Sequence, residues 1–200
     1  TGPFWFETQP NSMNKRRSDF IEEYVGASID ALRAMPRDPL VRAIDILQAA
    51  NERGARVLIA GNGGSASTAN HMATDLFNVS RRVVNGGFRP IALQQNPALV
   101  TATANDHGFD DIFAAQVRIL AESTDVLVVI TGSGESPNIV KALEVGKQMG
   151  LATIGLLGMG GGKAATLVDV PVVAPSDDYG IIEDLHLTVN HLVAAFLRSG

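Results

Sequence analysis

The chain contains no cysteine among its 200 residues. This excludes a disulfide framework and any thiolate metal site, so a bound metal would need histidine and carboxylate ligands. Basic residues form no long run, and the net charge is -5 at pH 7. Nucleic-acid and anionic-membrane binding both depend on clustered lysine and arginine, so neither is expected. With no signal-peptide pattern and no run near the roughly 20 apolar residues of a membrane span, we expect a cytoplasmic protein.

Aromatic residues are also scarce, at 6%, whereas 46% of the chain is hydrophobic and 20 residues are glycine. This composition is typical of helices packed closely on buried strands, as in α/β proteins. Residues 1–12 are interpreted as a foreign or disordered leader, because Met13 begins a polar segment that can form a helix. We therefore expect a single domain over residues 13–200.

Hydrophobic periodicity predicts alternating strands and helices after two N-terminal helices at 17–34 and 38–53. Short apolar runs bounded by Gly, Pro or Asp are expected to be buried strands, at 57–60, 90–93, 126–130, 152–157 and 170–173. Segments of helical period lie between and after them, at 65–77, 112–121, 136–148 and 181–197. This alternation predicts an α/β fold with three layers, a doubly wound parallel sheet of five strands and additional N-terminal helices.

The loop after the first predicted strand contains Gly61, Asn62, Gly63, Gly64 and Ser65 and leads into a helix. In open parallel sheets, ligands bind outside the carboxyl ends of the strands. Free backbone N–H groups and the positive end of a helix dipole could hold an anion or sugar hydroxyls here. The loop lacks the GxGxxG spacing and the lysine of known nucleotide loops. A tight turn without function is the alternative interpretation.

A second loop, after the strand at 126–130, contains Thr131, Gly132, Ser133 and Ser136 within six residues and again leads into a helix. Several hydroxyl and N–H donors at a helix N-terminus can bind a phosphate dianion without lysine. The alternative is that Ser136, followed by Pro137, only caps the helix. Capping does not account for Thr131 and Ser133.

These loops, together with Asn105 and Asp106, resemble the SIS (sugar isomerase) domain, and within it the phosphoheptose isomerases. The resemblance runs from about residue 17 to the C-terminus. It implies a flavodoxin-like fold and isomerisation of a phosphosugar between aldose and ketose forms, namely sedoheptulose 7-phosphate to D-glycero-D-manno-heptose 7-phosphate. It also implies that Asn105 and Asp106 bind sugar hydroxyls and that Thr131, Ser133 and Ser136 bind the phosphate. The composition of 105–108 alone favours a plain turn.

His71 and Asp75 lie four residues apart on one predicted helix, and Glu183 and His191 lie eight apart on the last. Each pair therefore shares a helix face, and together they suggest a site with four ligands, although His/Asp pairs are also ordinary surface pairs. The resemblance implies one Zn²⁺ per subunit bound by these four residues, with Asp75 as base and His191 as acid. Glu183 is also expected to contact the sugar. His186 faces elsewhere on its helix and is not expected to be a ligand.

Three positions depart from the pattern of the family: Asp75 replaces Glu, Glu183 replaces Gln, and Gly180 replaces Asp, whose sugar contact could move to Asp178. These departures keep open an isomerase for a different phosphosugar. A non-catalytic phosphosugar-binding regulatory SIS protein is the other alternative, although His71 and His191 favour an enzyme. The resemblance also implies a homotetramer, with which two amphipathic N-terminal helices agree.

Overall fold

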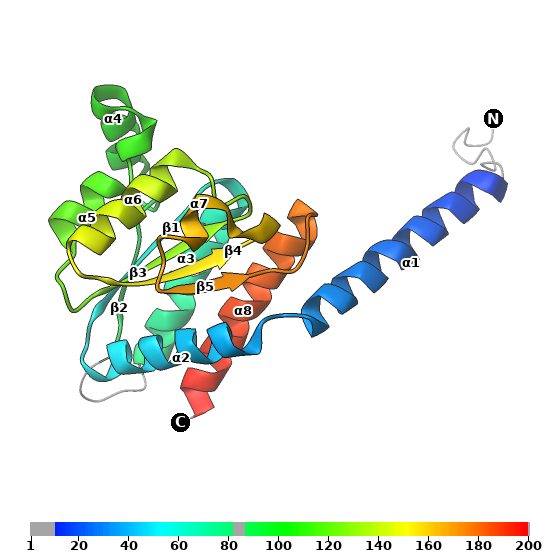
Figure 1. Cartoon of the computed structure of the whole chain (residues 1–200), viewed down its shortest axis with the longest axis horizontal. Coiled ribbons are helices and arrows are strands. Elements are labelled where there is room, and N and C mark those ends of the chain that lie inside the picture. Colours follow the sequence, from blue (N-terminus) through cyan, green and yellow to red (C-terminus); the bar gives the residue numbers. More distant parts are fainter. Residues whose placement is uncertain (1–10, 82–86, 200) are drawn as a thin grey trace, which may run out of the picture.

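One sheet of five parallel strands forms the centre of this computed structural model, which describes residues 11–81 and 87–199 (Figure 1). The strands are β1 (Arg56–Gly61), β2 (Arg89–Ala92), β3 (Val126–Thr131), β4 (Ala152–Leu157) and β5 (Val170–Val173). Their order is β2-β1-β3-β4-β5, and each neighbouring pair is parallel. The predicted five-stranded parallel sheet is confirmed.

This strand order is the flavodoxin-like, doubly wound order, in which the winding reverses between β1 and β3. The two strands are direct neighbours, with Gly61 at the end of β1 opposite Ile130. The loops that follow β1 and β3 therefore leave the same edge of the sheet side by side. A ligand of an open α/β sheet binds at such a reversal. The topology thus brings the two predicted loops together.

Helices cover both faces of the sheet. They are α1 (Asn11–Arg33), α2 (Arg37–Glu52), α3 (Gly63–Ser80), α4 (Pro97–His107), α5 (Ala114–Leu120), α6 (Pro137–Gln148), α7 (Gly162–Ala165) and α8 (Tyr179–Ser199). Because side chains alternate along a strand, Val57 and Ile59 of β1 pack with α2, α3 and α8, whereas Leu58 and Ala60 pack with α5 and α6. The three-layer arrangement is confirmed.

Helix α1 extends away from the sheet layers (Figure 1). Near its C-terminal end, Ala31 is buried with Ile181 and Leu185 of α8. Residues 1–10 of the expected leader lie outside the described residues, and residues 11 and 12 are the first of α1. Within the described ranges, no helix combines the length and apolar character needed to cross a membrane.

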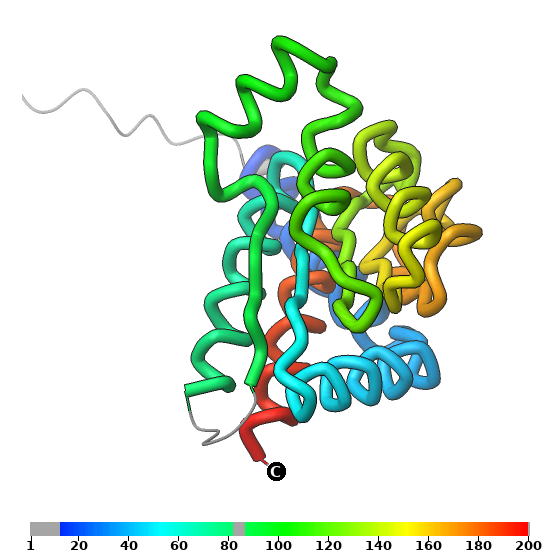
Figure 2. Tube along the Cα trace, turned by 90° about the vertical axis from the view of Figure 1, so that its left-hand side faces the viewer, coloured from blue at the N-terminus to red at the C-terminus, as the bar shows by residue number. Residues whose placement is uncertain are grey.

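Helix α4 projects beyond the rest of the fold in both views (Figures 1 and 2), and the sequence interpretation did not include it. Its start has recognisable signals: the Asn96 side chain accepts a hydrogen bond of 3.2 Å from the Leu99 N–H, and Pro97 follows the cap. Its end coincides with the expected turn at 105–108, because Gly108, with φ of 93°, terminates the helix. The short helices η1 (Phe109–Asp111), η2 (Met159–Gly161) and α7 were not predicted either.

Candidate active site

A pocket of about 230 Å³ lies where β1 and β3 end. It is lined by residues 62–65, residues 130–133, Ser136, Tyr179 and Glu183. Every substrate-binding residue predicted in the two loops is among them, as is Glu183. No lysine or arginine lines the pocket among the residues that the structure describes. A ligand here would therefore meet hydroxyls, backbone groups and one carboxylate.

The first loop bends sharply from β1 into α3. A Cβ on Gly61 would lie 2.5 Å from the Ser65 carbonyl oxygen, so glycine is required at this close approach. Asn62, just before α3, makes no side-chain capping bond. Its amide instead pairs with that of Asn138 on α6 through two reciprocal hydrogen bonds of 2.9 Å. This amide pair joins the helices that begin at the two loops.

The second loop, between β3 and α6, is held by its own hydroxyls. The Thr131 hydroxyl accepts a hydrogen bond of 3.2 Å from the Gly134 N–H, and the Ser133 hydroxyl accepts one of 3.2 Å from the Glu135 N–H. Ser136 occupies the N-cap position of α6, yet its side chain makes no capping hydrogen bond. Helix capping therefore does not use the Ser136 hydroxyl, and Ser136 lines the pocket.

A neighbouring segment fixes the second loop from outside. The Glu135 carboxylate accepts a hydrogen bond of 2.7 Å from the Lys163 N–H, and the Gly134 carbonyl accepts one of 2.9 Å from the Ala164 N–H. Gly134 has φ of 69°, and a Cβ there would collide with the Gly161 backbone. The loop conformation is thus fixed by contacts within the chain itself.

Helix α8 supplies the wall opposite the two loops. A Cβ on Gly64 would collide with the Glu183 carboxylate, so this carboxylate lies directly against the start of α3. A Cβ on Gly132 would come within 2.8 Å of the Tyr179 ring, which places that ring against the second loop. Tyr179 was not predicted as a site residue, because the sequence offered no motif at the first position of α8.

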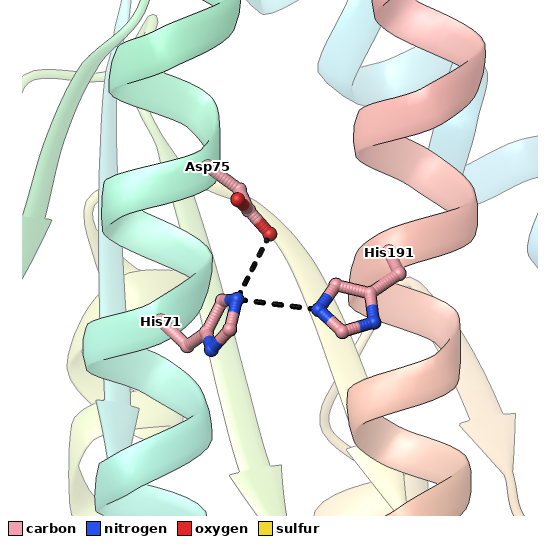
Figure 3. A group of neighbouring side chains, drawn as sticks. All are labelled: His71, Asp75 and His191. Atoms are coloured by element: carbon pink, nitrogen blue, oxygen red, sulfur yellow. Dashed lines mark hydrogen bonds and ion pairs between the residues drawn. The ribbon is translucent and has the colours of Figure 1, made fainter.

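A second group of polar side chains lies farther along α3 and α8 (Figure 3). His71 and Asp75 come from α3 and His191 from α8, and the side chains point toward one another between the helices. The Nε2 atoms of His71 and His191 are 3.2 Å apart, and His71 Nε2 is 3.5 Å from Asp75 Oδ2. Asp75 Oδ2 also accepts a hydrogen bond of 2.8 Å from Asn190. The expected pairing of the two helices around these three residues is therefore present.

These three side chains fit a divalent cation. One potential ligand atom from each lies within 4.8 Å of the others. Two imidazole nitrogens and one carboxylate oxygen are ligands that zinc accepts, and three protein ligands with an open fourth position are typical of catalytic zinc sites. His71 and His191 are both exposed, so a metal ion and substrate could reach the group.

Glu183, the expected fourth ligand, is not part of this group. It precedes His191 by eight residues, which corresponds to about 12 Å along a helix. As predicted, Glu183 and His191 both face α3, but two turns of α8 separate their side chains. Glu183 lies instead in the pocket, where the sequence interpretation also expected it to contact sugar.

Asn105 and Asp106 lie outside both groups. They occupy the last turn of α4, are exposed, and do not line the pocket. Their side chains bond to each other, with Asn105 donating to Asp106 at 2.8 Å. The structure of this chain alone therefore does not bring them to the sugar, and their expected role remains a prediction.

His186 is buried, at 1% exposure, on the opposite side of α8 from the metal-compatible group. Its Nε2 lies 3.0 Å from the Leu157 carbonyl, which fixes the tautomer with the proton on Nε2. Burial lowers the pKa of His186, and the hydrogen bond to Leu157 opposes this effect only in part. His186 thus supports the end of β4 and lies outside the group of His71, Asp75 and His191.

Known proteins resemble this chain in sequence and in fold. Residues 20–158 match the SIS domain family. A phosphoheptose isomerase of Geotalea daltonii is 40% identical over 162 residues, which cover 80% of this chain and 82% of the relative. The structure of a phosphoheptose isomerase from Neisseria gonorrhoeae superposes with a TM-score of 0.84 at 29% identity, covering 94% of this chain and all of the other. One from Francisella tularensis gives 0.82 at 31% identity, covering 95% and 100%.

The family match spans more than half of the chain, and the relative is similar over most of both lengths. The resemblance inferred from the glycine- and hydroxyl-rich loops is thereby confirmed. The chain belongs to the SIS domain family and, within it, to the phosphoheptose isomerases.

Proposed function

We propose that this protein is a cytoplasmic aldose-ketose isomerase that converts sedoheptulose 7-phosphate to D-glycero-D-manno-heptose 7-phosphate. The observation that carries the proposal is the pocket at the reversal of the sheet, lined by two hydroxyl- and amide-rich loops at helix N-termini. The pocket lies apart from the cluster of His71, Asp75 and His191, and this separation suits a substrate with a phosphate at one end and a carbonyl at the other.

The phosphate would bind to the loop of residues 131–136. Ser133 and Ser136 line the pocket at the start of α6, where the helix dipole and free N–H groups favour an anion. A single phosphate dianion would form charge-assisted hydrogen bonds with these donors. No cationic side chain is required for this mode of binding.

The length of the sugar follows from the spacing along α3. Gly64 lies against the pocket, and His71 follows it by seven residues, or about 10 Å along the helix axis. A substrate that reaches both groups needs several carbons between its phosphate and its carbonyl. A heptose phosphate in an extended form meets this requirement better than a triose phosphate.

The isomerisation moves a carbonyl from C2 to C1 through an enediol. A base must remove a proton from C1, C2 must gain a proton, and the O1 proton must be lost while O2 gains one. We assign the base to Asp75 and the acid to His191. Their separation across His71 lets both act on adjacent atoms of one bound substrate.

We also propose one Zn²⁺ per subunit, held by one ligand atom each of His71, Asp75 and His191. The second carboxylate oxygen of Asp75 and the second ring nitrogen of His191 would then carry out the proton transfers. A bound zinc ion would polarise the substrate carbonyl. Glu183 would instead accept hydrogen bonds from sugar hydroxyls, because it lies in the pocket against Gly64. Metal analysis of protein purified without added metal tests the ion, and full activity without bound metal would contradict it.

A homotetramer is supported by the apolar surface of α1, which faces no other part of the described chain. Phe20 is 65% exposed and Ile21 62% exposed, and Val25 of the same helix is also exposed. Exposed apolar helix faces of this kind are typically covered by another subunit. Light scattering would detect the assembly, and replacing Phe20 and Ile21 with serine should dissociate it. A stable, active wild-type monomer would contradict the proposal.

An isomerase for another phosphosugar is the second candidate, favoured by the carboxylate of Glu183 in the sugar pocket. A panel of ketose phosphates followed by NMR distinguishes the two, because only the true substrate gives the matching aldose. The variant His191→Ala should abolish turnover. Unchanged turnover would remove His191 from the mechanism, and no turnover of any ketose phosphate by the wild type would favour a non-catalytic binding protein.

A further inference from the structure

We propose that Asn190 is a positioning residue, which holds the Asp75 carboxylate in the orientation that faces His71 and His191. The proposal deepens the proposed function, on which it rests. Asn190 directly precedes His191 on α8, yet it was not among the residues predicted from the sequence. It is 1% exposed, so its side chain is enclosed between helices and not free to turn toward solvent.

The hydrogen bond from Asn190 fixes one particular oxygen of Asp75. Asn190 Nδ2 donates to Asp75 Oδ2 at 2.8 Å, and the same Oδ2 lies 3.5 Å from His71 Nε2. An ionised carboxylate can only accept hydrogen bonds, so the amide must present its Nδ2 and not its oxygen. The bond therefore sets the rotation of the carboxylate relative to the imidazole of His71.

A neutral amide suits this role because it directs the carboxylate without neutralising it. A lysine or arginine in the same place would compete with a cation for the charge of Asp75. The amide also remains a donor at every pH at which the protein folds. Partners of this kind, which orient a metal-binding carboxylate, typically change metal affinity or activity by about 10- to 100-fold when they are removed.

Asp75 has particular need of such a partner. The aspartate side chain is short, so the reach of its carboxylate depends on its rotation more than on its length. Asp75 is 16% exposed at its side chain, whereas His71 is 47% exposed. The carboxylate is therefore mostly enclosed, and its Oδ2 atom meets both the Asn190 amide and the His71 imidazole. Each of these contacts crosses from α3 to α8 or lies within one turn of α3.

The test compares Asn190→Leu, which removes the donor and keeps the branching of the side chain, with Val193→Ala as a control. Val193 of α8 is 2% exposed, packs into the core and is not part of the site. Its truncation should therefore loosen the same helix without affecting Asp75. Zinc affinity of metal-free protein is measured by competition with a chelating dye. Steady-state kinetics with sedoheptulose 7-phosphate and thermal unfolding are measured on the same samples.

For Asn190→Leu we expect zinc affinity and kcat to fall by about 10- to 100-fold. KM should change little, because the pocket residue Glu183 lies about two helical turns away on α8. Asn190→Ser, which keeps a hydroxyl donor, should recover part of both losses. The control Val193→Ala should lower the unfolding temperature and leave zinc affinity and kcat near the wild-type values.

Wild-type affinity and kcat in Asn190→Leu, with only a lower unfolding temperature, would overturn the positioning role. So would equal losses in Val193→Ala. A wild type that binds zinc but turns over no ketose phosphate would refute the proposed function, while the zinc affinities of the two variants would still decide the role of Asn190. A wild type that neither binds zinc nor turns over a ketose phosphate would refute both the proposed function and the role of Asn190.

Discussion

Replacing Asn138 with leucine should separate the two loops that form the pocket. Asn138 is 1% exposed and makes two reciprocal hydrogen bonds of 2.9 Å with the Asn62 amide. The variant Asn138→Leu keeps the branching of the side chain but leaves both polar groups of Asn62 without that partner. The stability of the fold and the alignment of the pocket should therefore fall together.

The magnitude follows from the burial of the pair. Loss of one partner typically costs about 1 to 3 kcal/mol when the remaining group is buried. Asn62 is only half buried and lines the pocket, so water can reach part of its amide. We expect a loss of about 2 kcal/mol. For a chain of this size, that corresponds to a decrease in unfolding temperature of about 4 to 8 °C.

The assay is a double-mutant cycle followed by calorimetry and kinetics. Asn62→Leu alone should cost more than Asn138→Leu alone, because it leaves the fully buried amide of Asn138 unpaired, and the double variant should cost much less than their sum. Asn138→Asp, which keeps an acceptor but loses the donor, should be intermediate. KM for the phosphosugar should rise in each variant. Additive losses in the double variant, or an unchanged KM, would refute the idea that the amide pair aligns the loops.

Two further predictions concern single residues. Ser136→Ala should raise KM by about 10- to 100-fold, since hydrogen bonds to charged groups contribute about 1.5 to 3 kcal/mol. The unfolding temperature should barely change, because the Ser136 hydroxyl makes no capping bond; a large loss of stability with an unchanged KM would restore the capping role. For His186, burial lowers the pKa below its ordinary value of 6.5, so the neutral form is favoured in the fold. Its contribution to stability is complete above pH 6.5 and is lost as the pH falls toward the lowered folded-state pKa. Urea unfolding from pH 7.5 to 5.5 should show a shallower loss for His186→Gln than for the wild type, and parallel profiles would contradict the assignment.

The sheet and its two loops could be predicted because their signals are local. Each strand is a short apolar run with a turn residue beside it, and the glycines and hydroxyls at 61–65 and 131–136 directly follow two of these runs. The neighbouring placement of β1 and β3 is also a general property of doubly wound sheets. Local pattern and topology therefore agree on where the pocket lies.

Helical periodicity was less reliable for the group on α3 and α8. It correctly placed Glu183 and His191 on one face of a helix. A shared face does not imply proximity, however, because eight residues span about 12 Å of helix. Glu183 therefore belongs to the pocket and not to the group of His71, Asp75 and His191.

Asn138 and Asn190 could not be recognised from the sequence alone. Asn138 lies in the first turn of a helix whose start is already indicated by Ser136 and Pro137. Asn190 directly precedes His191, which is the stronger candidate for a site residue. Each matters because of its partner on a distant segment: Asn62 is 76 positions from Asn138, and Asp75 is 115 from Asn190. Pairings over such distances depend on how helices pack, which periodicity does not specify.

The central claim is that hydroxyl and amide donors at the junction between β3 and α6 bind the phosphate of the substrate. The most direct measurement is a crystal structure of the protein soaked with sedoheptulose 7-phosphate. The phosphate oxygens should accept hydrogen bonds from Ser133, Ser136 and the N–H groups at the start of α6. A fully occupied phosphate held elsewhere, against lysine or arginine side chains, would contradict the account.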